Sequence, residues 1–220
     1  MADDKTAPVL VVGLGRFGSA VATTLVSRRR EVLAVDHDDE RVRRFADQVT
    51  HAVRADATDA LALQQLGVSD FPLAVVGIGS HVEASVLATS ALVDLGVTTI
   101  WAKAISAEHG RILERIGAHR VVYPESEAGE RVAHLVSEHL LDYIRFDDDF
   151  VLVKMVVPRS VAGLSLADAH LRRSHRVTVV GVKPPGGSFA YATPDTVLVE
   201  GSTLAVAGVD ADIERFAQLR

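Results

Sequence analysis

The 220-residue sequence contains no cysteine, which excludes disulfides, thiolate metal sites and cysteine nucleophiles. It also has no apolar stretch near the roughly 20 residues that a helix needs to cross a bilayer. The first residues, Met1 to Thr6, lack the basic start and apolar run of a secretory signal. These absences predict a protein of the reducing cytoplasm, whose contact with any membrane depends on a partner.

Positive charge is also scarce, because 23 Lys and Arg residues face 29 Asp and Glu residues, for a formal net charge of −6. Domains that bind nucleic acid normally present a basic face, so no nucleic acid partner is expected. The local run Arg28-Arg29-Arg30 is interpreted as the solvated end of a helix. Hydrophobic residues make up 48% of the chain, which is enough for a substantial core.

Short apolar runs alternate with helical patterns through the first part of the chain. Runs typical of strands lie at 8–12, 31–35, 51–54, 73–78, 98–104 and 120–123. This alternation predicts an α/β fold, a Rossmann-like doubly wound parallel sheet of about six strands with helices on both faces.

The pattern changes after Tyr143 to that of a second, smaller α+β lobe. Strands are expected there at 151–157, 177–182, 196–199 and 203–207, with one short helix at 166–172 and a closing helix at 211–219. We therefore expect two domains, 1–143 and 144–220, with the acidic residues 147–149 as an exposed hinge between them.

A glycine motif, GLGRFG at 13–18, directly follows the first expected strand and opens the first expected helix. In a G-x-G-x-x-G motif at this position, Gly13 permits the tight turn and Gly15 lets the backbone approach a pyrophosphate. Gly18 lets helix and strand pack closely. The exposed amides and the helix dipole then hold the anion. The alternative is that the glycines only make a tight turn between strand and helix.

Asp36 supplies the second half of this fingerprint, at the end of the second expected strand. An acid about 20 residues after the glycines hydrogen-bonds ribose hydroxyls and repels a 2′-phosphate, which disfavours NADP. His37 and Asp38 flank the same position, and Asp56, after the third strand, is placed to line the adenine side. Each acid has the alternative of a plain turn residue. The residues alone thus predict binding of an adenine nucleotide or dinucleotide, and the fold does not specify more.

Several segments resemble one known family along nearly the whole chain. In the first lobe they are VVGLGRFGSAVA, EVLAVDHDDERV, THAVRADATD, GIGSHVEASVLAT, IWAKA and RIGAHRVVYPE, and in the second GLSLADAHLRRSHRVTVVGVK and TPDTVLVEGSTLAVAG. The sequence is similar to the regulator-of-potassium-conductance (RCK, also KTN) family, and within it to the soluble gating subunits of Ktr- and Trk-type potassium uptake systems. It departs from the family at Ser202, where an acid often follows the glycine, and at Asp38 and Asp56, where some relatives carry Asn.

The resemblance implies a cytosolic regulatory subunit, not an enzyme, that gates a membrane-embedded potassium-translocating subunit from the inner face of the membrane. Members form homodimers that assemble into an octameric ring, and bound nucleotide sets the shape of the ring. ATP and ADP act in Ktr-type members and NAD(H) in many Trk-type members, and the sequence does not choose between them. Some relatives also use Mg²⁺ or Ca²⁺ near the nucleotide, or cyclic di-AMP between paired C-terminal lobes.

The resemblance also implies a set of contact residues in the first lobe. They are Gly13, Gly15, Arg16, Phe17 and Gly18 at the phosphates, Asp36, His37 and Asp38 at the ribose, Asp56 and Ala57 at the base, and then Ile78, Gly79, Ser80, Lys103, Ala104, Ile105, His109 and Glu125.

Three members of this set have plain alternatives. Lys103 is either a phosphate partner or one half of an ion pair with a local acid. His109 is either a ligand contact or a solvated helix residue. Glu125 is implied as the cation ligand, and its alternative is an acid that favours a helix dipole.

Two other functions compete with this interpretation. An NAD-dependent oxidoreductase needs an acid or base beside the nicotinamide. Here the second lobe shows no clustered catalytic residues, so none is assigned, and Ser165, His170 and His175 are interpreted as surface residues. A redox-sensing transcriptional repressor needs a basic DNA-binding module, which neither end of the sequence shows.

Overall fold

The structure is a computed structural model that describes residues 7–137 and 140–219. The chain divides into two compact units, Met1–Ser126 and Glu127–Arg220. This division lies before the expected boundary after Tyr143, because Tyr143 belongs to β7 (Asp142–Arg145), which pairs antiparallel with β8 (Phe150–Val156) of the second unit. The acidic residues 147–149 are therefore not a hinge but the connection between these two strands.

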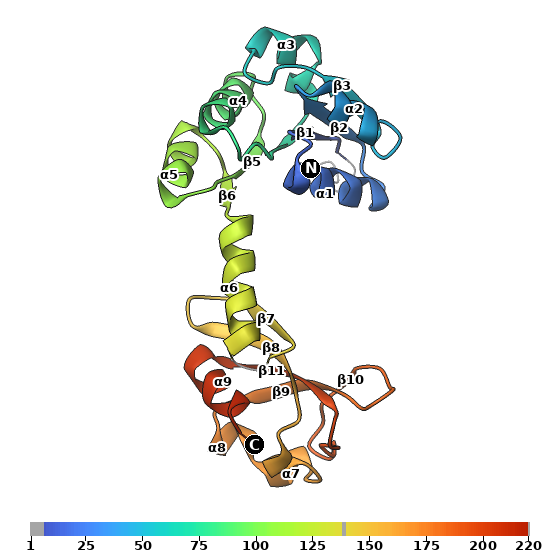
Figure 1. Ribbon diagram of the computed structural model, residues 1–220, viewed down its shortest axis with the longest axis vertical. Helices are drawn as coiled ribbons and strands as arrows, with labels where there is room; N and C mark the ends of the chain where they lie inside the picture. The colour runs from blue at the N-terminus through green and yellow to red at the C-terminus, as the bar shows by residue number, and fades with distance from the viewer. Residues whose placement is uncertain (1–6, 138–139, 220) are drawn as a thin grey trace. The chain divides into compact units, whose positions relative to one another are not determined.

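The first unit contains a six-stranded parallel sheet in the order β3-β2-β1-β4-β5-β6 (Figure 1). The strands are β1 (Val9–Val12), β2 (Val32–Asp36), β3 (His51–Arg54), β4 (Leu73–Val76), β5 (Thr99–Lys103) and β6 (Arg120–Val122). This order confirms the predicted Rossmann-like doubly wound fold.

Helices cover both faces of this sheet, which explains why its central strands are apolar without interruption. They are α1 (Arg16–Ser27), α2 (Asp39–Phe45), α3 (Ala60–Gln65), α4 (Val82–Asp94) and α5 (Ala107–Ile116), with a short 3₁₀ helix, η1, at Val68–Asp70. Val9 and Val11 of β1 enter the core that α1 and α2 complete. Leu10 and Val12 enter the opposite core, with α3, α4 and α5.

The second unit is built on a five-stranded antiparallel sheet in the order β10-β9-β11-β8-β7. Its remaining strands are β9 (Thr178–Lys183), β10 (Ala190–Tyr191) and β11 (Thr203–Val209), with α9 (Asp210–Ala217) after them and a 3₁₀ turn, η2, at Arg159–Val161. The helix α6 (Pro124–Ser137) starts in the last residues of the first unit and continues into the second. The smaller α+β lobe is confirmed.

The second unit differs from the expectation in several details, and its strands β7 and β10 were not predicted. The helix expected at 166–172 is two helices, α7 (Leu166–Ala169) and α8 (Leu171–Ser174), because His170 between them has a left-handed backbone with φ of 48°. The segment 196–199 is not a strand. Its Leu198 exchanges backbone hydrogen bonds with the loop at Gly163 and Leu164, at 2.8 and 2.9 Å, and not with the sheet.

Within the described ranges, none of the helices combines the length and the apolar character needed to cross a bilayer.

Candidate functional site

A pocket of about 570 Å³ opens where β1 to β5 end at their carboxyl side. The strand order reverses at β1 and β4, and ligands of open α/β sheets bind outside the carboxyl ends of strands at such a point. Most of the expected contact residues line this pocket, namely Gly13, Gly15, Arg16, Phe17, Asp36, His37, Asp56, Ala57, Ile78, Gly79, Ser80 and Lys103. Gly18, Asp38, Ala104, Ile105, His109 and Glu125 are not among its lining residues.

Glycine stands at each of the three motif positions for a different physical reason. Gly13 has φ of +92°, in the region that favours glycine. A Cβ atom on Gly18 would lie 1.8 Å from the Gly13 carbonyl oxygen, so only glycine lets α1 approach β1 this closely. Gly15 is in extended backbone, with φ of −67° and ψ of −174°, and a Cβ there would meet nothing within 4 Å. The fold itself therefore does not require glycine at position 15, whereas a ligand that approaches the backbone would.

Asp36 ties the glycine loop to the end of β2. Its side chain is buried, with Oδ2 accepting a hydrogen bond from the Leu14 amide at 2.6 Å and Oδ1 one from the Asp38 amide at 2.9 Å. Two cationic or ionisable neighbours lie near the same carboxylate, His37 Nδ1 at 3.2 Å from Oδ1 and Arg41 Nη1 at 3.6 Å from Oδ2. The acid predicted to meet ribose hydroxyls thus also holds the loop that would meet the phosphates.

The other two predicted acids accept local hydrogen bonds. Asp56 lines the pocket and accepts from the Thr58 amide at 2.9 Å and the Thr58 hydroxyl at 2.7 Å, which lowers the pKa of Asp56. Asp38 caps the start of α2 by accepting from the amides of Arg41 and Glu40. These backbone hydrogen bonds, with the Arg41 bond first, lower the pKa of Asp38. Both acids are therefore anionic near neutral pH.

Lys103 forms an ion pair with Glu125, with Nζ 2.6 Å from Oε1. Lys103 ends β5 and is only 9% exposed, so it needs an anionic partner, and its Nζ also lies 6.0 Å from the centre of the Phe17 ring. The hydrogen bond from Lys103 lowers the pKa of Glu125. Of the two expectations for Lys103, this structure contains the ion pair, and it lies at the wall of the pocket where an anionic ligand would compete for the lysine.

His109, which was expected as a ligand contact or a solvated helix residue, is buried in this structure. It is 2% exposed and lies on α5 outside the pocket lining, so the solvated interpretation was wrong. Nδ1 accepts a hydrogen bond from the Ile105 amide at 3.4 Å, and burial lowers the pKa of the imidazole. Ala104 is also buried, whereas Ile105 is exposed.

The sequence analysis missed three polar residues of the pocket wall, Arg41, Thr58 and His81. Arg41 and Thr58 had a recognisable signal, since each follows a predicted acid at a strand end within a few residues. His81 precedes α4 and carries no such signal.

Comparison with known proteins places both units in described families. Residues 9–124 match the TrkA-N domain and residues 150–219 the TrkA-C domain. Ktr system potassium uptake protein A of Bacillus subtilis is 35% identical over 213 residues, with 96% of both chains covered. Ktr system potassium uptake protein C of the same organism is 36% identical over 207 residues, with 94% of both chains covered.

Solved structures agree on the fold. The GsuK RCK domain superposes with a TM-score of 0.66 at 21% identity, covering all of this chain and 48% of its own, so the chain spans about half of that protein. The GsuK channel bound to NAD gives a TM-score of 0.65 at 20% identity, with 40% of that chain covered. With the two domain matches in this order and such identity to the Bacillus proteins over nearly the full length, the chain belongs to the family of Ktr system potassium uptake proteins.

Proposed function

We propose that this chain is a cytosolic regulatory subunit that binds an adenine nucleotide in its first unit and gates a membrane-embedded potassium-translocating subunit. The observation that carries the nucleotide site is Gly15, a glycine that the fold does not need, at the mouth of a pocket formed by the carboxyl ends of five strands. The potassium system is inferred from the relatives, which are named potassium uptake proteins.

A nucleotide panel tests the site and its ligand class. Nucleotide-stripped protein should bind ATP, ADP, NAD or NADH, and the preferred ligand decides between the Ktr-type and Trk-type alternatives. Asp36→Asn should weaken all of them roughly ten- to a hundredfold, as expected for a lost charged hydrogen bond of about 1.5–3 kcal/mol. Asp47→Asn, at an exposed acid of the same unit, should leave binding unchanged. Unchanged affinities in Asp36→Asn would contradict the ribose role.

The alternative function is an NAD-dependent oxidoreductase. A hydride-transfer assay over a panel of metabolites, run beside the nucleotide titrations, separates the two, because a regulatory subunit binds nucleotide without turning over substrate. The relatives are named potassium uptake proteins, which favours a role in potassium transport over an oxidoreductase.

A divalent cation, Mg²⁺ or Ca²⁺, is proposed at Glu125. The side chain is 58% exposed and pairs with Lys103, which lines the pocket. If nucleotide phosphates took over Lys103, the carboxylate of Glu125 would repel them unless a cation neutralised it. Oxygen ligands from a carboxylate and phosphates suit both ions. Glu125→Gln should therefore reduce the magnesium dependence of ATP binding, whereas Glu114→Gln, at an exposed acid of α5, should not. An intact dependence in Glu125→Gln would place the cation elsewhere.

The working assembly is proposed to be a homodimer that builds an octameric ring at the inner face of the membrane. A gating device must transmit a change of conformation to its partner, and a ring of nucleotide-binding units provides the differential contacts for it. The first unit has exposed apolar side chains on and near neighbouring helices that a second copy could cover, Val82, Leu87, Ile105 and Ile112.

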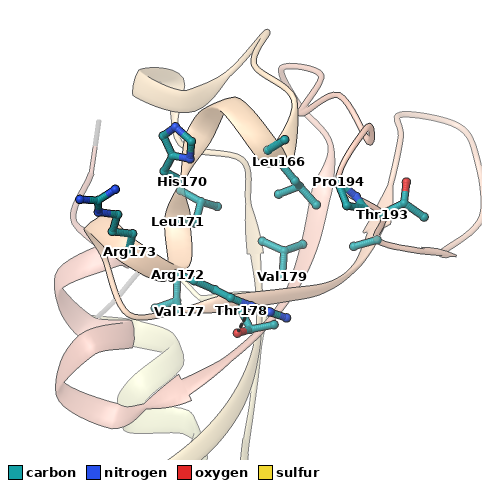
Figure 2. A pocket seen from close by; sticks show the side chains of 12 residues that line it. Leu166, His170, Leu171, Arg172, Arg173, Val177, Thr178, Val179, Thr193 and Pro194 are labelled. Carbon is teal, nitrogen blue, oxygen red and sulfur yellow. Dashed lines mark hydrogen bonds between the residues drawn. The ribbon is translucent and has the colours of Figure 1, made fainter.

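A second effector, cyclic di-AMP, is proposed in the second unit. A pocket of about 340 Å³ lies between α7, α8, β9 and the segment 192–194 (Figure 2). This volume is at the low end of about 300–1,000 Å³ for small-molecule sites, which suits half of a site shared by two copies. Leu166 and Val179 offer an apolar surface, and Arg172, which extends along its edge and donates to Thr178 Oγ1 at 3.1 Å, offers guanidinium donors for a phosphodiester.

Calorimetry with cyclic di-AMP tests this second site on the full chain. Saturable heat, weakened in Arg172→Ala and unchanged in the exposed control Arg159→Ala, would support it. The absence of both heat and a shift in melting temperature would contradict it.

A further inference from the structure

Three side chains with metal-ligating groups meet in the second unit. His134 comes from α6, and Asp210 and Glu214 come from α9. Each offers one ligand atom, and the three atoms lie within 4.8 Å of one another. Asp210 and Glu214 are four residues apart, so both point from the same face of α9. An imidazole and two carboxylates from two helices thus converge on one point.

Asp210 brings a buried oxygen that lacks a hydrogen-bond donor among the described residues. Its Oδ1 is inaccessible to solvent and has no such partner. Its Oδ2 is occupied, since the Tyr143 hydroxyl donates to it at 3.3 Å and Arg145 Nη2 lies 3.7 Å away. A buried carboxylate oxygen without a donor is costly, and a bound cation would satisfy it.

Tyr143 orients two of the three groups. Its ring stacks on His134 with centroids 3.9 Å apart and an angle of 5°, while its hydroxyl holds Oδ2 of Asp210. Such outer contacts fix the orientation of ligands in protein metal sites.

Arg145 is a cation near Asp210 that would oppose a metal ion, with Nη2 3.7 Å from Oδ2. Its guanidinium is bound by the Glu130 carboxylate and donates to the Asp148 carbonyl at 2.7 Å. These acceptors hold the arginine on the Oδ2 side of Asp210. Oδ1 of the same carboxylate has no hydrogen-bond partner among the described residues.

We propose that His134, Asp210 and Glu214 bind a zinc-class divalent transition-metal ion. Imidazole nitrogen together with carboxylate oxygen suits zinc and its neighbours, whereas magnesium and calcium prefer oxygen ligands only. The two carboxylates balance the charge of the ion, and three protein ligands leave a fourth position for water. This site is separate from the proposed nucleotide and cyclic di-AMP sites and does not depend on them. A bound ion would tie α6 to α9 within the second unit.

Zinc binding to the full-length chain tests the proposal. Chelator-treated protein is titrated with Zn²⁺ in the presence of a competing chromophoric chelator, and one saturable site per chain is expected. Removal of an outer contact of a metal ligand costs about 10- to 100-fold in affinity, so His134→Gln and Glu214→Gln should each lose at least about tenfold. His51→Gln, at an exposed histidine of β3, should bind like wild type, and excess Mg²⁺ should not displace the zinc.

Two further measurements keep the test decisive. Glu214 is exposed, so Glu214→Gln decides the outcome if His134→Gln, which removes the ring stacked on Tyr143, fails to fold. Co²⁺ in place of zinc should give visible absorption bands that change in Glu214→Gln but not in His51→Gln. The proposal is overturned if wild type shows no saturable zinc site, or if Glu214→Gln binds zinc and cobalt as wild type does.

Discussion

Arg16 distinguishes two possible functions of the pocket. One is a switch that responds differently to ATP and ADP, and the other is a site that binds a dinucleotide without such a response. Arg16 is the first residue of α1, is exposed and lines the pocket. A cation at a helix N-terminus opposes the dipole, and a terminal phosphate compensates because guanidinium donors match phosphate oxygens. Arg16→Ala should therefore reduce ATP affinity roughly ten- to a hundredfold and ADP affinity much less, as measured by paired calorimetry.

The control for this prediction is Arg28→Ala, at an exposed arginine just beyond the other end of the same helix. It changes the net charge equally and should leave both affinities unchanged. Equal losses for ATP and ADP in Arg16→Ala would make Arg16 a general pyrophosphate clamp, which NAD binding would require, and would contradict the ATP switch.

His109 predicts a pH dependence of stability. Burial lowers its pKa from the ordinary 6.5, so the unfolded chain binds this proton more tightly than the folded one. The contribution of His109 to the free energy of unfolding is complete above the unfolded pKa. It is lost as the pH falls from there towards the lowered folded pKa. Protonation would also place a proton on Nδ1, which accepts from the Ile105 amide.

The variant His109→Asn keeps an acceptor for the Ile105 amide but does not titrate in this range. Its melting temperature should fall less than that of wild type between about pH 7.5 and 5.5, a range that brackets the ordinary histidine pKa. His51→Asn, at an exposed histidine, should follow wild type. If calorimetry shows that the melting temperature of His109→Asn falls as much as that of wild type over this range, other groups cause the pH dependence.

At the scale of elements, the glycine loop and α1 predict that two similar substitutions have opposite consequences. Gly18→Ala would bring a Cβ to 1.8 Å from the Gly13 carbonyl oxygen, which must force α1 away from β1. Overpacking of this kind costs about 1–3 kcal/mol of folding stability. Gly15→Ala meets no atom within 4 Å and has ordinary backbone angles, so stability should change by less than about 1 kcal/mol.

Nucleotide binding distinguishes the same pair. Gly15→Ala should lose most of its affinity because the methyl group occupies the space through which phosphates would approach the backbone. Chemical unfolding gives the stability of each variant, and nucleotide titration gives its affinity. If Gly15→Ala folds normally and binds nucleotide normally, the loop is only a strand–helix turn, which is the alternative that the sequence left open.

At the scale of the whole molecule, assembly should depend on the exposed apolar residues of α4 and α5 in the first unit. Leu87 is 46% and Ile112 43% exposed, and both are large enough to stabilise contact with a second copy. Leu87→Asp should lower the molar mass measured by light scattering at micromolar concentration with nucleotide present. Leu61→Asp, a matched change at an exposed leucine of α3, should keep the wild-type mass. A monomeric wild type would contradict the ring.

The sequence by itself determined the class of the fold and the framework of the first pocket. Continuous apolar runs alternate with helical patterns along the first unit. This alternation is typical of a parallel sheet covered by helices on both faces, so the six strands were predictable. The motif at Gly13, Gly15 and Gly18 and the acid at Asp36 were predictable because their spacing along the chain reflects local backbone geometry. The end of the first unit was not, since a helix crosses it at Ser126 and the strand containing Tyr143 is short.

Only the tertiary structure decided which side chains meet. Lys103 and Glu125 are 22 residues apart and pair because β5 and the start of α6 come together at the pocket wall. His109 has the same local pattern as a surface residue, and packing alone buried it. His134 meets Asp210 and Glu214 because the part of α6 from Glu127 onward and α9 both belong to the second unit. Such contacts depend on the packing of elements distant in sequence, which no local period encodes.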